Sequence, residues 1–109
     1  RDSFIAHIGG DDFLVGLKDH EYKEVLKLTQ EVQNEFKSTA ENIYKKVDRE
    51  NGFIVSKDRF NMERKFDLLS VSSAIIEINS KSNISNFDNT LNILKKASKG
   101  SIEPIFSIL

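Results

Sequence analysis

Four adjacent residues near the start of the chain, Gly9, Gly10, Asp11 and Asp12, are of types that could do chemistry on a nucleotide. The glycines permit a tight turn and carry no side chain that would block a phosphate approaching the backbone. Two neighbouring carboxylates offer the oxygen ligands that Mg²⁺ prefers, and this ion is usually shared with substrate phosphates. One carboxylate could bind the metal while the other activates or orients a hydroxyl nucleophile. The same tetrapeptide also suits an ordinary polar turn, which is commonly rich in Gly and Asp, and by itself it favours that simpler interpretation.

The segments on either side of this turn have the composition of a β-hairpin. Residues 4–8 and 13–17 are rich in Phe, Ile, Val and Leu, and the Gly-Gly pair lies between them. Because both arms are almost continuously apolar, we expect both faces of the hairpin to be covered and its strands to be central.

A long helix is predicted to follow, from Glu21 to Asn51. Apolar residues recur there at intervals of three and four, which is the period of one helical face. Gly52 fits the left-handed position that commonly ends a helix. The stripe consists of Tyr22, Val25, Leu26, Val32, Phe36, Ala40, Ile43, Tyr44 and Val47.

The rest of the chain predicts three strands and one helix. Strands are expected at 53–58 and 66–78, joined by the polar stretch "RFNMER", and a last strand at 105–109. Between them, Ser85 is expected to cap a helix that ends at Gly100. The order is therefore β-β-α-β-β-α-β, an α+β fold with helices packed on a mainly antiparallel sheet.

Composition and charge exclude several classes of protein. The chain has 109 residues, 39% hydrophobic and 30% charged, which fits one soluble globular domain. Its net charge of −1 gives no broad attraction to nucleic acid or to an anionic membrane. It contains no cysteine, so disulfides, thiolate metal sites and a cysteine nucleophile are all excluded. His7 and His20 have no partner at motif spacing, which favours structural or solvated roles.

The loop "HIGGDDF" and four later features resemble the GGDEF family, the diguanylate cyclase domains of bacterial signalling. The later features are the aromatics Phe36 and Tyr44 with "DRENGFIV" at 48–55, Lys57-Asp58-Arg59, "SVSSAII" at 70–76, and Leu94-Lys95-Lys96 with Lys99. They occur in the family's order at plausible spacing over nearly the whole chain. The resemblance implies a palm-like fold and identifies residues 1–109 as the C-terminal portion of such a domain, without the family's N-terminal strand and helices.

The resemblance also implies an activity and a set of site residues. Two such domains face each other, and each holds one GTP with Mg²⁺ (or Mn²⁺), so that the pair condenses two GTP molecules into cyclic di-GMP. Gly9 and Gly10 would make room for phosphate, Asp11 and Asp12 would share metal binding and hydroxyl activation, and Lys99 would contact phosphate. GTP as substrate implies a cytoplasmic location, although the parent protein could be membrane-anchored elsewhere.

Three alternatives remain open from the sequence. In the first, the parent protein is a diguanylate cyclase. In the second, the domain is degenerate and binds GTP or a partner domain without catalysis. In the third, the chain is an unrelated α+β domain whose hairpin mimics the motif. Asp12 stands where the family usually has Glu, which is one methylene longer. Without the N-terminal half we expect this isolated chain to be inactive. We also expect its unpaired apolar sheet edge to pair with a second copy, exchange elements or aggregate, unless separate N-terminal residues cover it.

Overall fold

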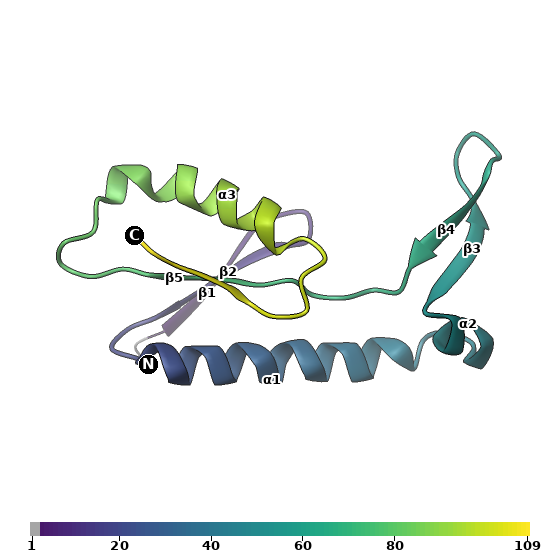
Figure 1. Ribbon diagram of the computed structural model, residues 1–109, viewed down its shortest axis with the longest axis horizontal. Helices are drawn as coiled ribbons and strands as arrows, with labels where there is room; N and C mark the ends of the chain where they lie inside the picture. Colours follow the sequence, from purple (N-terminus) through teal and green to yellow (C-terminus); the bar gives the residue numbers. More distant parts are fainter. Residues whose placement is uncertain (1–2) are drawn as a thin grey trace.

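The computed structural model describes residues 3–109, and Arg1 and Asp2 lie outside the described part. Strands and helices follow one another along the chain in the order shown in Figure 1. The elements are β1 (Ser3–Gly9), β2 (Asp12–Leu17), α1 (Tyr22–Glu41), α2 (Lys46–Asn51), β3 (Phe53–Lys57), β4 (Glu63–Asp67), β5 (Ala74–Glu77), the 3-10 turn η1 (Ile84–Asn86), α3 (Phe87–Ser98) and β6 (Ile105–Ile108).

The strands form three separate two-stranded sheets within residues 3–109. β1–β2 and β3–β4 are antiparallel hairpins, whereas β5 and β6 are parallel and are connected through α3. The predicted α+β class is confirmed, and so are the first hairpin and the last strand. The described strands do not join into the single, mainly antiparallel sheet that the sequence led us to expect.

The core lies around β5, which runs between α1 and α3 (Figure 1). Each of these three elements contributes one buried apolar side chain, namely Ala40 of α1, Ile75 of β5 and Leu94 of α3. Ser98, at the end of α3, is also buried and donates its hydroxyl to the carbonyl oxygen of Lys95. Packing against one short strand therefore holds the two long helices in place.

The predicted helix from Glu21 to Asn51 is interrupted, and this part of the prediction is wrong. α1 ends at Glu41, and the amides of Ile43 and Tyr44 bond carbonyls three residues back, not four. Lys45 is then extended before α2 begins. The Tyr44 hydroxyl accepts a hydrogen bond of 3.0 Å from the amide of Leu69, so a tertiary contact holds the break in place. The predicted end at Gly52 is confirmed, with a left-handed φ of 80°.

The predicted strand 66–78 is confirmed only at residues 66–67, in β4, and 74–77, in β5, because residues 68–73 form an irregular connection between them. Two of its backbone groups bond side chains and not a neighbouring strand: the Leu69 amide bonds Tyr44, and the Val71 carbonyl accepts from Gln33 Nε2 at 2.8 Å. The predicted polar connector "RFNMER" is shorter than expected, since β4 begins at Glu63.

The start of α3 differs from the prediction by a few residues. Ser85 does not cap α3: Asn86 is its N-cap residue and forms no side-chain capping bond, whereas Asn83 caps the preceding turn, since Asn83 Oδ1 accepts from the Ser85 amide at 3.1 Å and from its hydroxyl at 2.6 Å. The turn η1 follows, and α3 starts at Phe87. Within the described residues, no helix combines the length and the apolar character that a membrane span requires.

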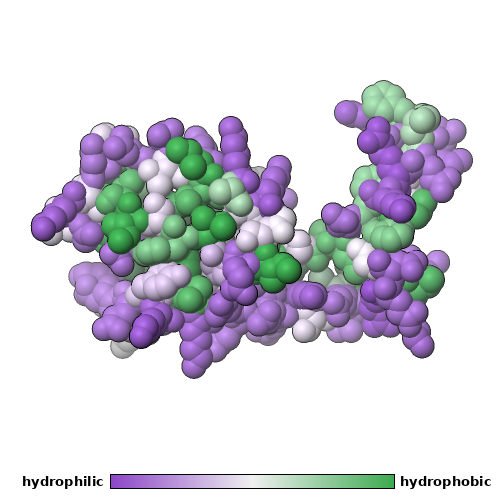
Figure 2. All heavy atoms as spheres, in the orientation of Figure 1, coloured by the Kyte–Doolittle hydropathy of each residue, from purple (hydrophilic) through white to green (hydrophobic). Residues whose placement is uncertain are grey.

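An arm consisting of α2, β3 and β4 (residues 46–67) projects from the rest of the molecule, which we call the body (Figure 1). The radius of gyration is 16.8 Å, against about 13 Å for a compact domain of this length. The accessible surface is 9039 Å², whereas a folded monomer of 12.4 kDa exposes about 6,100 Å². Figure 2 shows hydrophobic side chains on the outside of both the body and the arm. Much apolar surface is therefore left uncovered by the chain itself.

We predict that Leu94→Ala lowers the free energy of unfolding by about 2–4 kcal/mol, because it opens a cavity where only 7% of the side chain is exposed. The matched control is Ile93→Ala, one residue earlier on α3, where 59% of the side chain is exposed and the expected change is within about 0.5 kcal/mol. Urea unfolding followed by circular dichroism measures both. Equal losses for the two variants would contradict the assignment of the core.

Candidate functional site

The turn between β1 and β2 places the two predicted glycines at an open position. Gly9 pairs with Asp12 across the hairpin, and the register shifts between His7 and Gly9. Gly10 has a φ of 56°, in the left-handed region that glycine adopts readily. No heavy atom lies within 4 Å of the point where a Cβ would stand on either glycine. The space beside the backbone of both glycines is therefore open.

His7 supports this turn through two contacts. Its Nε2 bonds the carbonyl oxygen of Gly10 at 2.7 Å, and its ring stacks on Phe13 with centroids 4.7 Å apart. His20 similarly bonds the carbonyl of Lys18 through Nδ1 at 2.7 Å. Both contacts are local and favour the structural roles expected for the two histidines.

The two aspartates of the turn differ in their surroundings. Asp11 lies exposed at the tip, whereas Asp12 is half-buried at the first position of β2. Lys95, from the last turn of α3, donates from Nζ to Asp12 Oδ2 at 2.6 Å. Both side chains are partly open to solvent, 50% for Lys95 and 42% for Asp12. The fold therefore brings a cation to one of the predicted catalytic carboxylates.

Lys95 forms this contact with Asp12. Lys99 is the lysine that the family resemblance assigns to phosphate. Lys99 is the C-cap residue of α3, one turn further along, and within residues 3–109 its side chain forms no ion pair with the hairpin. Residues four apart share a helical face, so the sequence placed both lysines on the same side of α3. The position of α3 relative to the hairpin decides which of them reaches Asp12, and in the structure it is Lys95. Sequence reasoning treated Lys95 as a solvated helix end and missed this role.

The carboxylate pair offers an incomplete set of metal ligands. Among residues 3–109 no group of three or more His, Cys, Asp or Glu side chains is placed to hold a metal ion. Asp11 and Asp12 supply oxygen donors suited to Mg²⁺, and they fit such an ion where substrate phosphates and water complete its shell. The ammonium group of Lys95 competes for one of these donors.

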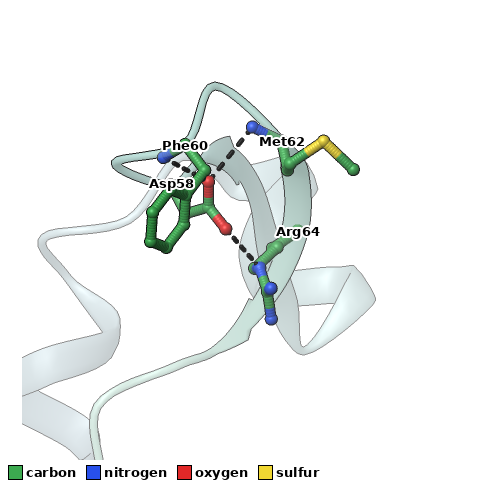
Figure 3. Close-up of polar contacts among 4 residues, drawn as sticks. All are labelled: Asp58, Phe60, Met62 and Arg64. Carbon is green, nitrogen blue, oxygen red and sulfur yellow. Dashed lines mark hydrogen bonds and ion pairs between the residues drawn. The ribbon is translucent and has the colours of Figure 1, made fainter.

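A second polar cluster, which sequence reasoning did not single out as a site, organises the tip of the arm (Figure 3). Asp58 Oδ1 accepts from the amides of Phe60 at 2.8 Å and Met62 at 3.1 Å, and Oδ2 accepts from Arg64 Nε. These bonds, that of Met62 foremost, hold the pKa of Asp58 below its usual value, and desolvation offsets them in part. Asp at the start of a turn is the sequence signal for this arrangement, because its side chain commonly bonds amides further along.

A cavity of about 300 Å³ lies beside α1, lined by Gln30, Gln33, Asn34, Ile102 and Glu103. Gln30 Nε2 donates to Glu103 Oε2 at 2.9 Å, so Glu103 is engaged by α1 and not by the hairpin. The Oε1 atom of Gln33 is buried without a protein partner. None of the predicted site residues lines this cavity, and it is separate from the turn.

We predict that the amide chemical shifts of Phe60 and Met62 titrate together in NMR spectra, with a midpoint below the usual aspartate value of 3.8. The folded-state pKa of Asp58 is lowered, so its contribution to stability is present above the unfolded pKa and is lost as the pH falls through the folded one. The tip of the arm should therefore loosen in acid. In Asp58→Asn this titration should vanish; its persistence would assign the transition to another group.

A double-mutant cycle measures the contact between Asp12 and Lys95. We expect Lys95→Met and Asp12→Asn to show a coupling of about 0.2–1 kcal/mol in urea unfolding, weaker in salt, because both side chains are partly exposed. Lys99→Met, which removes a charge one turn away, should show no coupling with Asp12→Asn. Equal coupling for both lysines would show that only the general charge of the helix end matters.

The chain was compared with protein families, curated proteins and solved structures. No family model, no curated protein and no solved structure matches the chain. The features that bear on function are therefore the turn at Gly9 to Asp12, its contact with Lys95 and the motifs in the sequence.

Proposed function

We propose that this chain is part of a GGDEF-type signalling domain with a palm-like arrangement, and that its parent protein condenses two GTP molecules into cyclic di-GMP. The observation that carries the proposal is the turn at Gly9 to Asp12. It combines open space beside two glycines with two adjacent carboxylates. The ordered series of motifs from Phe36 to Lys99 supports the same assignment.

Each residue of the turn has a role in this reaction. Gly9 and Gly10 admit the phosphates to the backbone, and Asp11 and Asp12 would hold Mg²⁺ or Mn²⁺ and orient the 3′-hydroxyl group. The bound metal would supply charge stabilisation for the phosphates. The 3′-oxygen of one GTP bonds the α-phosphorus of the other, its proton passes to a base, and pyrophosphate leaves. Two such steps close the ring and release two pyrophosphates.

Lysines at the end of α3 can supply positive charge to this chemistry. Lys95 already contacts Asp12, and Lys99 lies one turn beyond it. Metal and nucleotide have to compete with the Lys95 ammonium for Asp12, after which that ammonium is free to pair with a phosphate oxygen. Lys99 is the proposed second phosphate contact.

The reaction requires two domains, because each holds one GTP and attacks the nucleotide of the other. The proposed partner is therefore a second GGDEF domain, as a homodimer, with GTP as the ligand and no nucleic acid. The cytoplasm is the proposed location because it supplies GTP, and we infer no direct membrane contact for this segment.

One observation favours a second candidate function, a catalytically degenerate module. The ammonium group of Lys95 already lies 2.6 Å from Asp12 Oδ2, where a bound metal ion would be expected. In this case the domain binds GTP or a partner domain and signals through its conformation or its dimerisation.

The test uses the full-length protein that contains this chain, incubated with GTP and Mg²⁺, with cyclic di-GMP measured by chromatography. We expect product from the parent protein and at least a hundredfold less from Asp11→Asn/Asp12→Asn, because loss of a catalytic group typically costs this much or more. Asp19→Asn is the matched control: Asp19 lies just beyond β2 with a φ of 56°, which Asn tolerates, and this variant should retain activity. Bound GTP without product would support the degenerate module, and the absence of product, of GTP binding and of self-association would overturn both proposals.

A further inference from the structure

The arm lacks a core of its own and receives little cover from the body. Its elements pack on one another, and within residues 3–109 none of them packs extensively on the body. A two-stranded hairpin alone is marginally stable in water. In addition, three apolar residues of the arm are largely exposed: Val55 by 52%, Phe60 by 71% and Met62 by 61%. The apolar side chains of the arm are therefore available to another surface.

The two edges of the β3–β4 hairpin differ in their protection against pairing. β4 reads Glu-Arg-Lys-Phe-Asp, so four of its five residues are charged. β3 reads Phe-Ile-Val-Ser-Lys, and its first four residues are uncharged. Charged side chains are a common means by which proteins block edge strands, so β3 is the edge left open to another strand.

The backbone of β3 presents its free groups at this edge. The Asp58 amide donates to the Met62 carbonyl at 2.9 Å, so this pair is hydrogen-bonded. Hydrogen-bonded and non-hydrogen-bonded pairs alternate along an antiparallel ladder. Counting back places Ser56 and Ile54 in bonded pairs and Val55 in a non-bonded pair with β4. The N–H and C=O groups of Val55 therefore point away from β4.

We propose that β3 pairs antiparallel with β3 of a second copy of this chain, which forms a four-stranded sheet across a two-fold axis. Val55 faces Val55 of the partner subunit at the axis. Lys57 then lies opposite Phe53 of the partner subunit, so no like charges oppose each other along the pair. Such a contact is self-complementary, as two-fold symmetry requires. It is separate from the proposed pairing of nucleotide sites and does not depend on catalysis.

The antiparallel direction also explains the apolar residues at the two ends of the arm. It places the tip of each arm, with Phe60 and Met62, level with α2 of the other copy. There Val47 is 58% exposed, and on either side of the arm Ile43 and Leu69 are 70% and 55% exposed. Each tip can thus cover apolar side chains at the base of the partner arm.

The exposed area is sufficient for such a dimer. The chain exposes 9039 Å², about 2,900 Å² more than a compact monomer of its mass. A standard protein interface buries about 800 Å² on each partner. This excess is spread over the body and the arm, and it is larger than one interface of that size requires.

The first measurement is the mass in solution of the full 109-residue chain, by sedimentation over a series of concentrations. We expect a dimer of twice 12.4 kDa. Val55→Lys and Val55→Glu place like charges at the axis and should each weaken the dimer at least tenfold, with circular dichroism unchanged. The matched control is Val15→Lys, which puts the same charge on the β1–β2 hairpin at a side chain that is 56% exposed. This variant should remain dimeric.

Mixing the two variants tests the geometry directly. If residue 55 faces itself across the axis, the Lys and Glu variants should form a mixed dimer of opposite charges when combined, at concentrations where each variant alone has dissociated. A monomeric parent chain would overturn the proposal. So would a dimer or larger assembly that survives Val55→Lys, dissociation by Val15→Lys alone, or failure of the mixture to associate.

Discussion

Packing of β5 between α1 and α3 is the interaction on which the remaining structure depends. Ile75 of this strand is buried, and each of the two helices that contact the strand has one buried apolar side chain, Ala40 in α1 and Leu94 in α3. β5 and β6 are parallel, so the chain must cross over between them, and α3 forms that crossover. The docking of α3 on this pair in turn sets where its last turn lies. Because Lys95 occupies that turn, the core determines which cation meets the hairpin carboxylate.

The small size of this core has a second consequence, which is the amount of apolar surface left outside. The outer face of the β1–β2 hairpin carries Ile5, Phe13 and Val15, which are 77%, 65% and 56% exposed. We expected both faces of this hairpin to be covered, and within the described residues this expectation is wrong. A chain with this pattern gains free energy when other apolar surface meets it, at about 25 cal/mol per Å² buried. The arm and the hairpin are two such surfaces, and the arm is the one that projects away from the rest of the molecule (Figure 1).

The turn at Gly9 to Asp12 shows how neighbouring charges set the conditions for binding. Two adjacent carboxylates repel each other, and an ammonium group at 2.6 Å from Asp12 relieves part of that repulsion. A divalent cation would do the same more strongly, and would have to displace this lysine or share the carboxylate with it. The contact therefore fits both proposed functions. It holds the turn ready in a cyclase, and it replaces the metal in a degenerate module.

The sequence by itself determined the local features of this protein. Apolar runs around two glycines predicted the first hairpin, Gly52 predicted the end of a helix, and the motifs identified Asp11 and Asp12 as candidate residues. Contacts between distant residues decided the rest. The bond from Leu69 to Tyr44 fixes the break after α1, and the contact of Lys95 with Asp12 joins residues 83 positions apart. Periodicity reports only which residues share a face of one element, whereas the depth at which that element docks depends on packing across the whole chain, and this is why only the tertiary structure could select Lys95 over Lys99.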